Sequence, residues 1–316
     1  MSYAGPEFDA PEPRRTRRGP LTLALAALVP AAVVGWLVYE AVAAPGHGPS
    51  GAASAKSSPA TTASGTASPG QDDAKRPAVP PAATPGAHVA GSGSLAGKVV
   101  VIDPGHNPGN FRHASEIGRK VDIGTNSKEC DTTGTATNSG YTEARFTLDV
   151  ARRLRTTLQK QGATVKFTQD GDRPWGPCVD ERARIGNQAH ADAAISIHAD
   201  GAPAGDRGFH VILPDAVRSG AADTRPIVAP SRSLGEHIAG GFVRATGSAP
   251  SNYLGHGTGL VVRGDLGGLN LSTVPKVFIE CGNMRDSKDA AQLTSGAWRQ
   301  KAAQGISEGI VGFLRG

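Results

Sequence analysis

The sequence has few aromatic side chains, few charges and few cysteines for its 316 residues. Charged residues make up 19%, which is too few for a chain kept disordered by like charges, and a mean hydropathy of −0.26 excludes a protein that crosses a membrane many times. With a net charge of +5, no basic stripe and no run of aromatic residues, we expect no nucleic-acid partner. The three cysteines, Cys130, Cys178 and Cys281, match neither a zinc-knuckle spacing nor a C-x-x-C redox motif.

The N-terminal part carries an export or anchoring signal. Residues 14–18 read RRTRR, and an almost uninterrupted apolar run follows from 21 to 39. This pattern predicts a cytoplasmic basic tail over 1–20 and a transmembrane signal anchor over 21–43. A cleaved signal peptide is the alternative, because AVAA at 41–44 resembles a cleavage site. A buried core helix over the apolar run is disfavoured by Pro30 in its middle. The signal anchor and the cleaved signal peptide both place the rest of the chain outside the cytoplasm, either anchored to the membrane or secreted.

Glycine and proline are abundant, with 42 and 23 residues, and many of them lie between the apolar run and the folded part. Residues 44–94 consist almost entirely of Ala, Pro, Ser, Thr and Gly. Such a segment cannot bury enough apolar surface to offset its ordering entropy, so we predict a disordered linker. Residues 95–316 are then expected to form a single catalytic domain.

The predicted domain alternates strands with helices. Apolar runs at 98–104, 163–169, 194–198, 208–214, 259–263 and 275–280 predict strands. An apolar residue at every fourth position from Phe146 to Leu158 predicts a helix that ends at Gly162, and a single closing helix is expected from Lys288 to about Leu314. This order predicts an α/β fold: a mostly parallel central sheet flanked by helices on both faces.

Four residues that could bind a metal ion or transfer a proton lie at positions that such a fold would bring close together. His106, His198 and Glu280 stand at or just beyond the carboxyl ends of predicted strands, and Glu143 opens the first long helix. Groups in these positions meet at one edge of a parallel sheet. Two imidazoles and one carboxylate make the ligand set of a catalytic zinc site, which leaves a second carboxylate for proton transfer.

Each of the four residues also has a simpler structural explanation. A histidine after a strand is commonly a turn or surface residue, and a glutamate in the first turn of a helix interacts favourably with the helix dipole. Glu280 is harder to explain in this way, because it follows the apolar residues VFI in a predicted central strand. A carboxylate there is costly without a cation or a chemical task.

Four segments of the chain carry a family resemblance: VVVIDPGHNPG, TEARFTLDVARRLRTTLQKQGATVKFTQDGD, ERARIGNQAHADAAISIHADG and VPKVFIECGNMRDSKDAAQL. In order and spacing they resemble the zinc-dependent N-acetylmuramoyl-L-alanine amidases of bacterial cell walls, over residues 97–316. The stretch RGDLGGLN at 263–270 is closest to the actinobacterial branch. The chain departs from the family pattern at Ala144, where many members have Lys, and at CGNMRD after Glu280.

The resemblance implies roles for individual residues. The implied ligands of one Zn²⁺ ion are His106 of the DPGH element, Glu143 at the start of the first long helix, and His198 of the SIHA element. Glu280 is implied as the catalytic residue. The implied activity is hydrolysis of the amide between N-acetylmuramic acid and L-Ala in peptidoglycan. We expect the protein to be a monomer. Another zinc-dependent cell-wall peptidase and a non-catalytic wall-binding module remain as alternatives.

The cysteines of an extracytoplasmic domain can form disulfides. Cys130 and Cys178 both lie in predicted loops, so we predict that they pair with each other and leave Cys281 free.

Overall fold

The computed structural model describes residues 94–316, so the predicted basic tail, membrane segment and nearly all of the predicted linker lie outside the described residues. Within residues 94–316, none of the helices combines the length and apolar character needed to span a bilayer.

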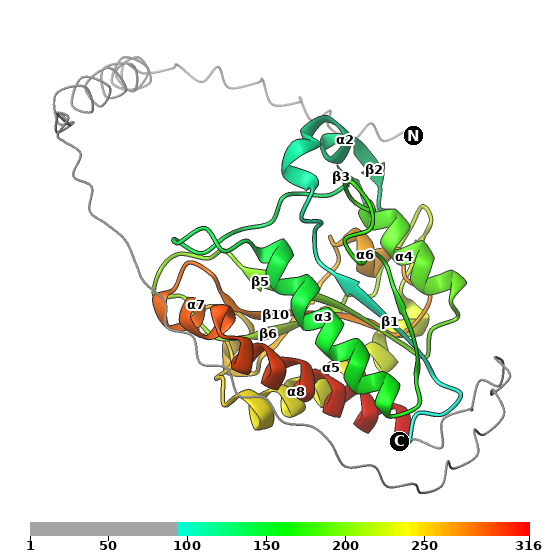
Figure 1. Cartoon of the computed structure of the whole chain (residues 1–316). Helices are drawn as coiled ribbons and strands as arrows, with labels where there is room; N and C mark the ends of the chain where they lie inside the picture. Colours follow the sequence, from blue (N-terminus) through cyan, green and yellow to red (C-terminus); the bar gives the residue numbers. More distant parts are fainter. Residues whose placement is uncertain (1–93) are drawn as a thin grey trace, which may run out of the picture. The chain divides into compact units, whose positions relative to one another are not determined.

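A six-stranded sheet forms the centre of the described part (Figure 1). Its strands, in spatial order, are β4 (Thr164–Phe167), β1 (Val99–Pro104), β5 (Ala193–Asp200), β10 (Lys276–Asn283), β6 (His210–Pro214) and β9 (Leu260–Arg263). Neighbouring strands run parallel except β10 and β6, which are antiparallel. The predicted mostly parallel sheet is confirmed, with each strand within a few residues of the expected range.

Helices cover both faces of this sheet (Figure 1). The long helices α3 (Glu143–Lys160), α5 (Arg225–Thr246) and α8 (Gly296–Arg315) pack on one face, with α8 between the other two. On the opposite face lie α4 (Val179–Gln188) and the short α6 (Gly267–Asn270). The smaller elements are η1 (Asn110–Arg112), α2 (Ala114–Gly118), the hairpin of β2 (Lys120–Asp122) and β3 (Ser127–Glu129), the pair β7 (Arg218–Ser219) and β8 (Ala222–Asp223), η2 (Gly255–Gly257) and α7 (Ser287–Thr294).

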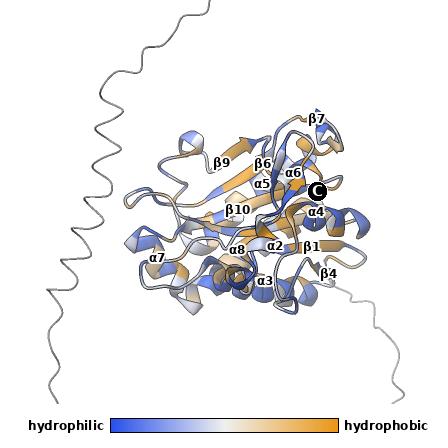
Figure 2. Cartoon of the chain, turned by 90° about the horizontal axis from the view of Figure 1, so that it is seen from above, coloured by the Kyte–Doolittle hydropathy of each residue, from blue (hydrophilic) through white to orange (hydrophobic). Residues whose placement is uncertain are grey.

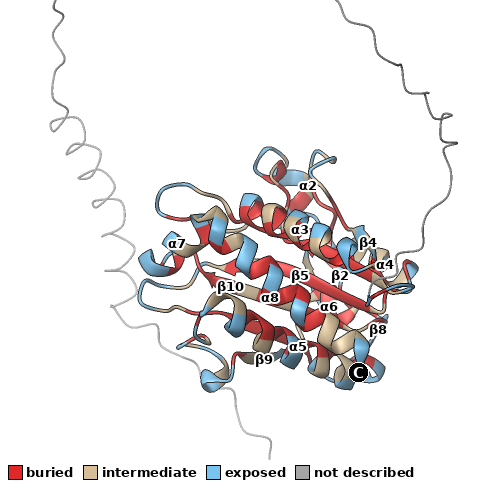
Figure 3. Cartoon of the chain, turned by 60° about the horizontal axis from the view of Figure 1, so that its bottom comes forward, coloured by how far each residue is buried: buried red, intermediate tan, exposed pale blue. Residues whose placement is uncertain are grey.

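The main core lies between the sheet and the three long helices. The predicted apolar stripe of α3, from Phe146 to Leu158, is fully buried there. Hydrophobic residues gather on the strands in Figure 2, and Figure 3 shows β5 buried along most of its length. Ile195 and Ile197 of β5 belong to this core. Because successive side chains of a strand point to opposite faces, Ser196 and His198 lie on the face that carries α4 and α6.

The expectation of one closing helix from Lys288 to about Leu314 is wrong. The segment forms two helices, α7 and α8, separated at Ser295, whose backbone is extended. The Ser295 side chain accepts a hydrogen bond from the backbone N–H of Trp298 and so caps the start of α8. A serine that caps a new helix offers the backbone an alternative to continuing the old one.

Cys130 and Cys178 form a disulfide, as predicted, which joins the chain after β3 to the residue before α4. Cys281 is buried and free among the described residues, which include all three cysteines. The bridge closes a loop with a sequence separation of 48 residues.

We expect the double variant Cys130→Ser/Cys178→Ser to lose stability. For a loop of this length the chain-entropy model gives a loss of about 4 kcal/mol in the free energy of unfolding. Urea unfolding of the variant and the oxidised wild type measures this difference, and Cys281→Ser serves as the control for a thiol outside the bridge. Equal midpoints and slopes for the double variant and the wild type would refute a stabilising role of the bridge.

Candidate metal centre

The structure brings His106, Glu143 and His198 together from three separate elements. His106 follows the end of β1, Glu143 is the first residue of α3, and His198 lies near the end of β5. Each residue offers one possible ligand atom, an imidazole nitrogen or a carboxylate oxygen, and these three atoms lie within 4.8 Å of one another. The sequence-based expectation that these side chains meet at the carboxyl ends of the strands is therefore met by the geometry.

Glu143 stands between the two histidines and contacts both. Its Oε2 is 3.2 Å from Nε2 of His106, and its Oε1 is 3.0 Å from Nδ1 of His198. The two imidazole rings lie edge to face, with their centroids 5.1 Å apart. All three side chains are largely buried, so two imidazole nitrogens and one carboxylate oxygen face a common point shielded from most solvent.

Backbone groups hold the Glu143 carboxylate in place. The N–H of Thr135 donates to its Oε2 at 2.9 Å, and the N–H of Ala199 donates to its Oε1 at 3.2 Å. This arrangement needs a glycine at position 134, where φ is +72° and an added Cβ would stand 2.7 Å from the Glu143 carboxylate. Gly105 is needed for a similar reason, because an added Cβ would lie 2.3 Å from the His198 ring.

The electrostatics of the cluster favour a cation. Burial alone would lower the pKa of His106, but the charges of Glu143 and Asp131 and their hydrogen bonds raise it well above its usual value. Burial alone would raise the pKa of Glu143, but the two histidines hold it far below its usual value. Glu143 is therefore ionised, and the negative charge it brings needs a positive partner, which either a protonated imidazole or a metal ion supplies.

Glu280 lines the same cavity as the three residues. Its register neighbour across the parallel pair is His198, so both side chains lie on the same face of the sheet. Its Oε2 is buried and has no hydrogen-bond partner within residues 94–316. Burial, followed by the charges of Glu143 and Asp200, raises the pKa of Glu280 well above its usual value. A carboxylate in this state is suited to exchange a proton with a group that enters the cavity.

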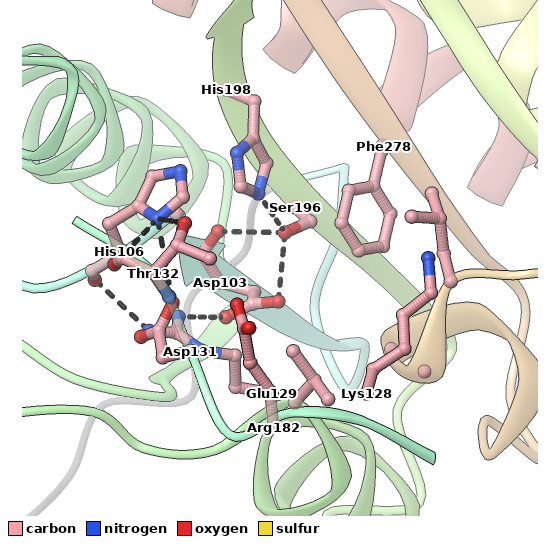
Figure 4. A pocket seen from close by; sticks show the side chains of 15 residues that line it. Asp103, His106, Lys128, Glu129, Asp131, Thr132, Arg182, Ser196, His198 and Phe278 are labelled. Atoms are coloured by element: carbon pink, nitrogen blue, oxygen red, sulfur yellow. Dashed lines mark hydrogen bonds and ion pairs between the residues drawn. The ribbon is translucent and has the colours of Figure 1, made fainter. Parts of the chain in front are cut away.

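Several residues around the site were not expected from the sequence. Asp131 lies beside His106, Ser196 contacts His198, and Arg182 and Asp103 lie buried behind both histidines (Figure 4). Two of them carried a detectable signal: Asp103 is an acidic residue at the end of an apolar strand, and Ser196 precedes His198 by two residues and so shares its face. Arg182 carried none, because its partners come from distant segments.

Comparisons with known proteins agree with this geometry. The profile of the family described as N-acetylmuramoyl-L-alanine amidase matches residues 100–311. An N-acetylmuramoyl-L-alanine amidase of Mycobacterium tuberculosis is 41% identical over 222 residues, which cover 70% of this chain and 88% of that protein. Crystal structures of the N-acetylmuramyl-L-alanine amidase Ami1 from Mycobacterium smegmatis and Mycobacterium abscessus superpose with TM-scores of 0.64 and 0.63. Each of the two is 40% identical in sequence to this chain. The aligned parts cover 70% and 69% of this chain, and 98% and 99% of the two mycobacterial chains. A match that spans nearly the whole folded part, at this level of identity, establishes that the chain belongs to the N-acetylmuramoyl-L-alanine amidase family.

Proposed function

We propose that this protein is a zinc-dependent peptidoglycan hydrolase that cleaves the amide between N-acetylmuramic acid and L-Ala of the stem peptide. The observation that carries the proposal is the convergence of His106, Glu143 and His198 on one point, with the unpartnered carboxylate oxygen of Glu280 in the same cavity. Family membership and the names of the relatives support the choice of this amide over other bonds.

The residues of the cluster fit a single zinc ion. Imidazole nitrogens and a carboxylate oxygen are ligands that zinc accepts, and three protein ligands leave a position for substrate or solvent. Nε2 of His106, the carboxylate of Glu143 and Nδ1 of His198 would hold the ion, because these are the atoms that face one another. When bound, zinc polarises a carbonyl group and lowers the pKa of water, which is the chemistry that amide hydrolysis near neutral pH needs.

Glu280 is the proposed proton carrier. Its buried Oε2 is free to take a proton from the attacking water, since no neighbour within residues 94–316 donates to it. The same carboxyl group then delivers this proton to the amide nitrogen, which leaves as the free amine of L-Ala. Because burial raises its pKa well above the usual value, the group holds a proton more readily than an ordinary glutamate before it releases it to the leaving nitrogen.

We further propose that the protein acts outside the cytoplasm as a monomer. In this arrangement residues 21–43 anchor it to the membrane or direct its secretion, 44–94 form a spacer, and 95–316 form the catalytic domain. The basic and apolar segments at 14–39 and the disulfide between Cys130 and Cys178 support an extracytoplasmic location. Fractionation of cells tests it: the chain is expected in the membrane or secreted fraction and not in the cytoplasm.

Analysis of the products tests the activity. Purified protein with one equivalent of zinc is incubated with muramyl peptide, and the new amino terminus is identified. We expect a free N-terminal L-Ala on an intact stem peptide. A released terminal amino acid would instead identify a peptidase, and binding of wall fragments without cleavage, even with zinc added, would identify a non-catalytic module.

A further inference from the structure

The histidine nitrogens that face away from Glu143 are also hydrogen-bonded. Nδ1 of His106 lies 3.1 Å from the carbonyl oxygen of Thr132 and 3.4 Å from Oδ1 of Asp131. Nε2 of His198 lies 3.2 Å from Oγ of Ser196. A histidine can bind a metal only through a nitrogen that carries no proton, so these contacts bear on which nitrogen of each ring is available.

The direction of the bonds behind His198 follows from Asp103. The hydroxyl of Ser196 lies 2.8 Å from Oδ2 of Asp103, a fully buried carboxylate that can only accept while it is ionised. It is held ionised by Lys276, whose Nζ is 3.1 Å from Oδ2, and by Arg182, whose Nη1 is 2.7 Å from Oδ1. Ser196 therefore donates its one proton to Asp103 and accepts from Nε2–H of His198. The lone pair of that ring is then on Nδ1, which faces Glu143.

The carboxylate behind His106 is held by the same arginine. Nη2 of Arg182 donates to Oδ2 of Asp131 at 2.9 Å, so this guanidinium joins Asp131 to Asp103 (Figure 4). Arg182 also donates to three backbone carbonyls, those of Pro104, His106 and Pro177. An arginine with this many donated bonds has little freedom to move, and it fixes the positions of both carboxylates at once.

Burying this cluster requires charge balance. Asp103 and Asp131 bring two negative charges, and Arg182 and Lys276 bring two positive charges, all on side chains with an exposed fraction of 6% or less. Each charge is paired and hydrogen-bonded, which is the condition under which such a group can be buried. The cluster therefore adds no net charge behind the cation site.

We propose that Ser196, Asp103, Asp131 and Arg182 form one positioning unit that presents Nε2 of His106 and Nδ1 of His198 to the metal. The inference rests on the proposed zinc site. Its sharpest consequence concerns Ser196. Without the hydroxyl, His198 can move its proton to Nδ1 and donate to Oε1 of Glu143, which lies 3.0 Å away. That tautomer turns the metal-binding nitrogen into a donor and occupies the carboxylate ligand as well.

Ser196→Ala tests the inference through metal affinity and ring tautomer. We expect its dissociation constant for zinc, measured by chelator competition, to rise about 10–100-fold, the usual effect of losing an outer hydrogen bond of a metal ligand. In ¹⁵N-histidine NMR spectra of the zinc-loaded proteins, His198 should bind zinc through Nδ1 and carry its proton on Nε2 in the wild type, and the population in this state should fall in the variant. Ser196→Thr keeps the hydroxyl and should restore both. Ser272→Ala removes another buried, hydrogen-bonded serine without contact to a histidine and should change neither.

The outcomes separate this inference from the proposed function. A wild type that binds zinc, together with a Ser196→Ala variant of unchanged affinity and tautomer, would overturn the positioning unit and leave the zinc site intact. If Ser196→Ala does not fold, the same NMR measurement on the zinc-loaded wild type tests the inference. Coordination of zinc by both rings through Nε2 would contradict it. A wild type that binds no zinc would overturn the proposed function and the inference together.

Discussion

We expect the replacement of Glu280 by glutamine to lower kcat/KM for muramyl peptide hydrolysis by about 10²–10⁴-fold, the range for loss of a general acid–base group. Glutamine matches the size of glutamate but cannot carry the proton from water to the leaving nitrogen. Because Glu280 is not among the three residues of the metal cluster, the variant should still bind one zinc ion per chain. Steady-state kinetics and metal analysis of the same preparation measure both quantities. Glu308→Gln is the matched control, since Glu308 is exposed on α8 and should leave both unchanged.

The pH profile gives an independent check on Glu280. In the proposed mechanism the carboxylate form is the base. Burial raises its pKa above the usual value, so the rate of the wild type should fall as the pH drops through this raised pKa. The acid limb should therefore lie above the range of an ordinary glutamate, and it should be missing from the residual activity of Glu280→Gln. Unchanged turnover in the variant, or an identical acid limb, would remove Glu280 from the mechanism.

Removing one ligand should abolish metal binding and activity together. We expect His198→Ala to bind zinc more than about 100-fold more weakly, because loss of an outer-shell partner alone costs 10–100-fold. Activity should fall to background at stoichiometric zinc. His237→Ala is the control, since His237 lies on α5 away from the cavity and contacts the carbonyl of Ser233. A His198→Ala variant that keeps tight zinc binding would contradict the ligand set.

Much of the fold could be predicted from the sequence because strands and helices here have distinct periods. The apolar stripe of α3 is complete from Phe146 to Leu158, and the run before Asp103 is apolar at every position, as a central parallel strand should be. The convergence of the candidate residues followed from the same reasoning: His106, His198 and Glu280 each come at or just beyond the end of a predicted strand, and parallel strands end at one edge.

The features of the fold and the site that were not predicted depend mostly on contacts between distant segments, and the spacing of apolar residues does not indicate such contacts. The break at Ser295 was missed because apolar residues recur on both sides of it, so that α7 and α8 resemble one helix. The link between Arg182, Asp103 and Asp131 joins residues 51 and 79 positions apart in the chain, and no local pattern marks it. The long loop between β1 and α3 folds into α2 and a hairpin whose short strands are only partly buried and carry almost no hydrophobic signal.

The central claim is that His106, Glu143 and His198 together hold one zinc ion with a position left open. X-ray absorption at the zinc edge of the stoichiometrically loaded protein tests it most directly. The account predicts a shell of nitrogen and oxygen only, with scattering from two imidazoles, loss of one imidazole in His198→Ala, and a change of the shell when a hydroxamate inhibitor is added. A sulfur ligand such as Cys281, or a shell that His198→Ala leaves unaltered, would contradict it.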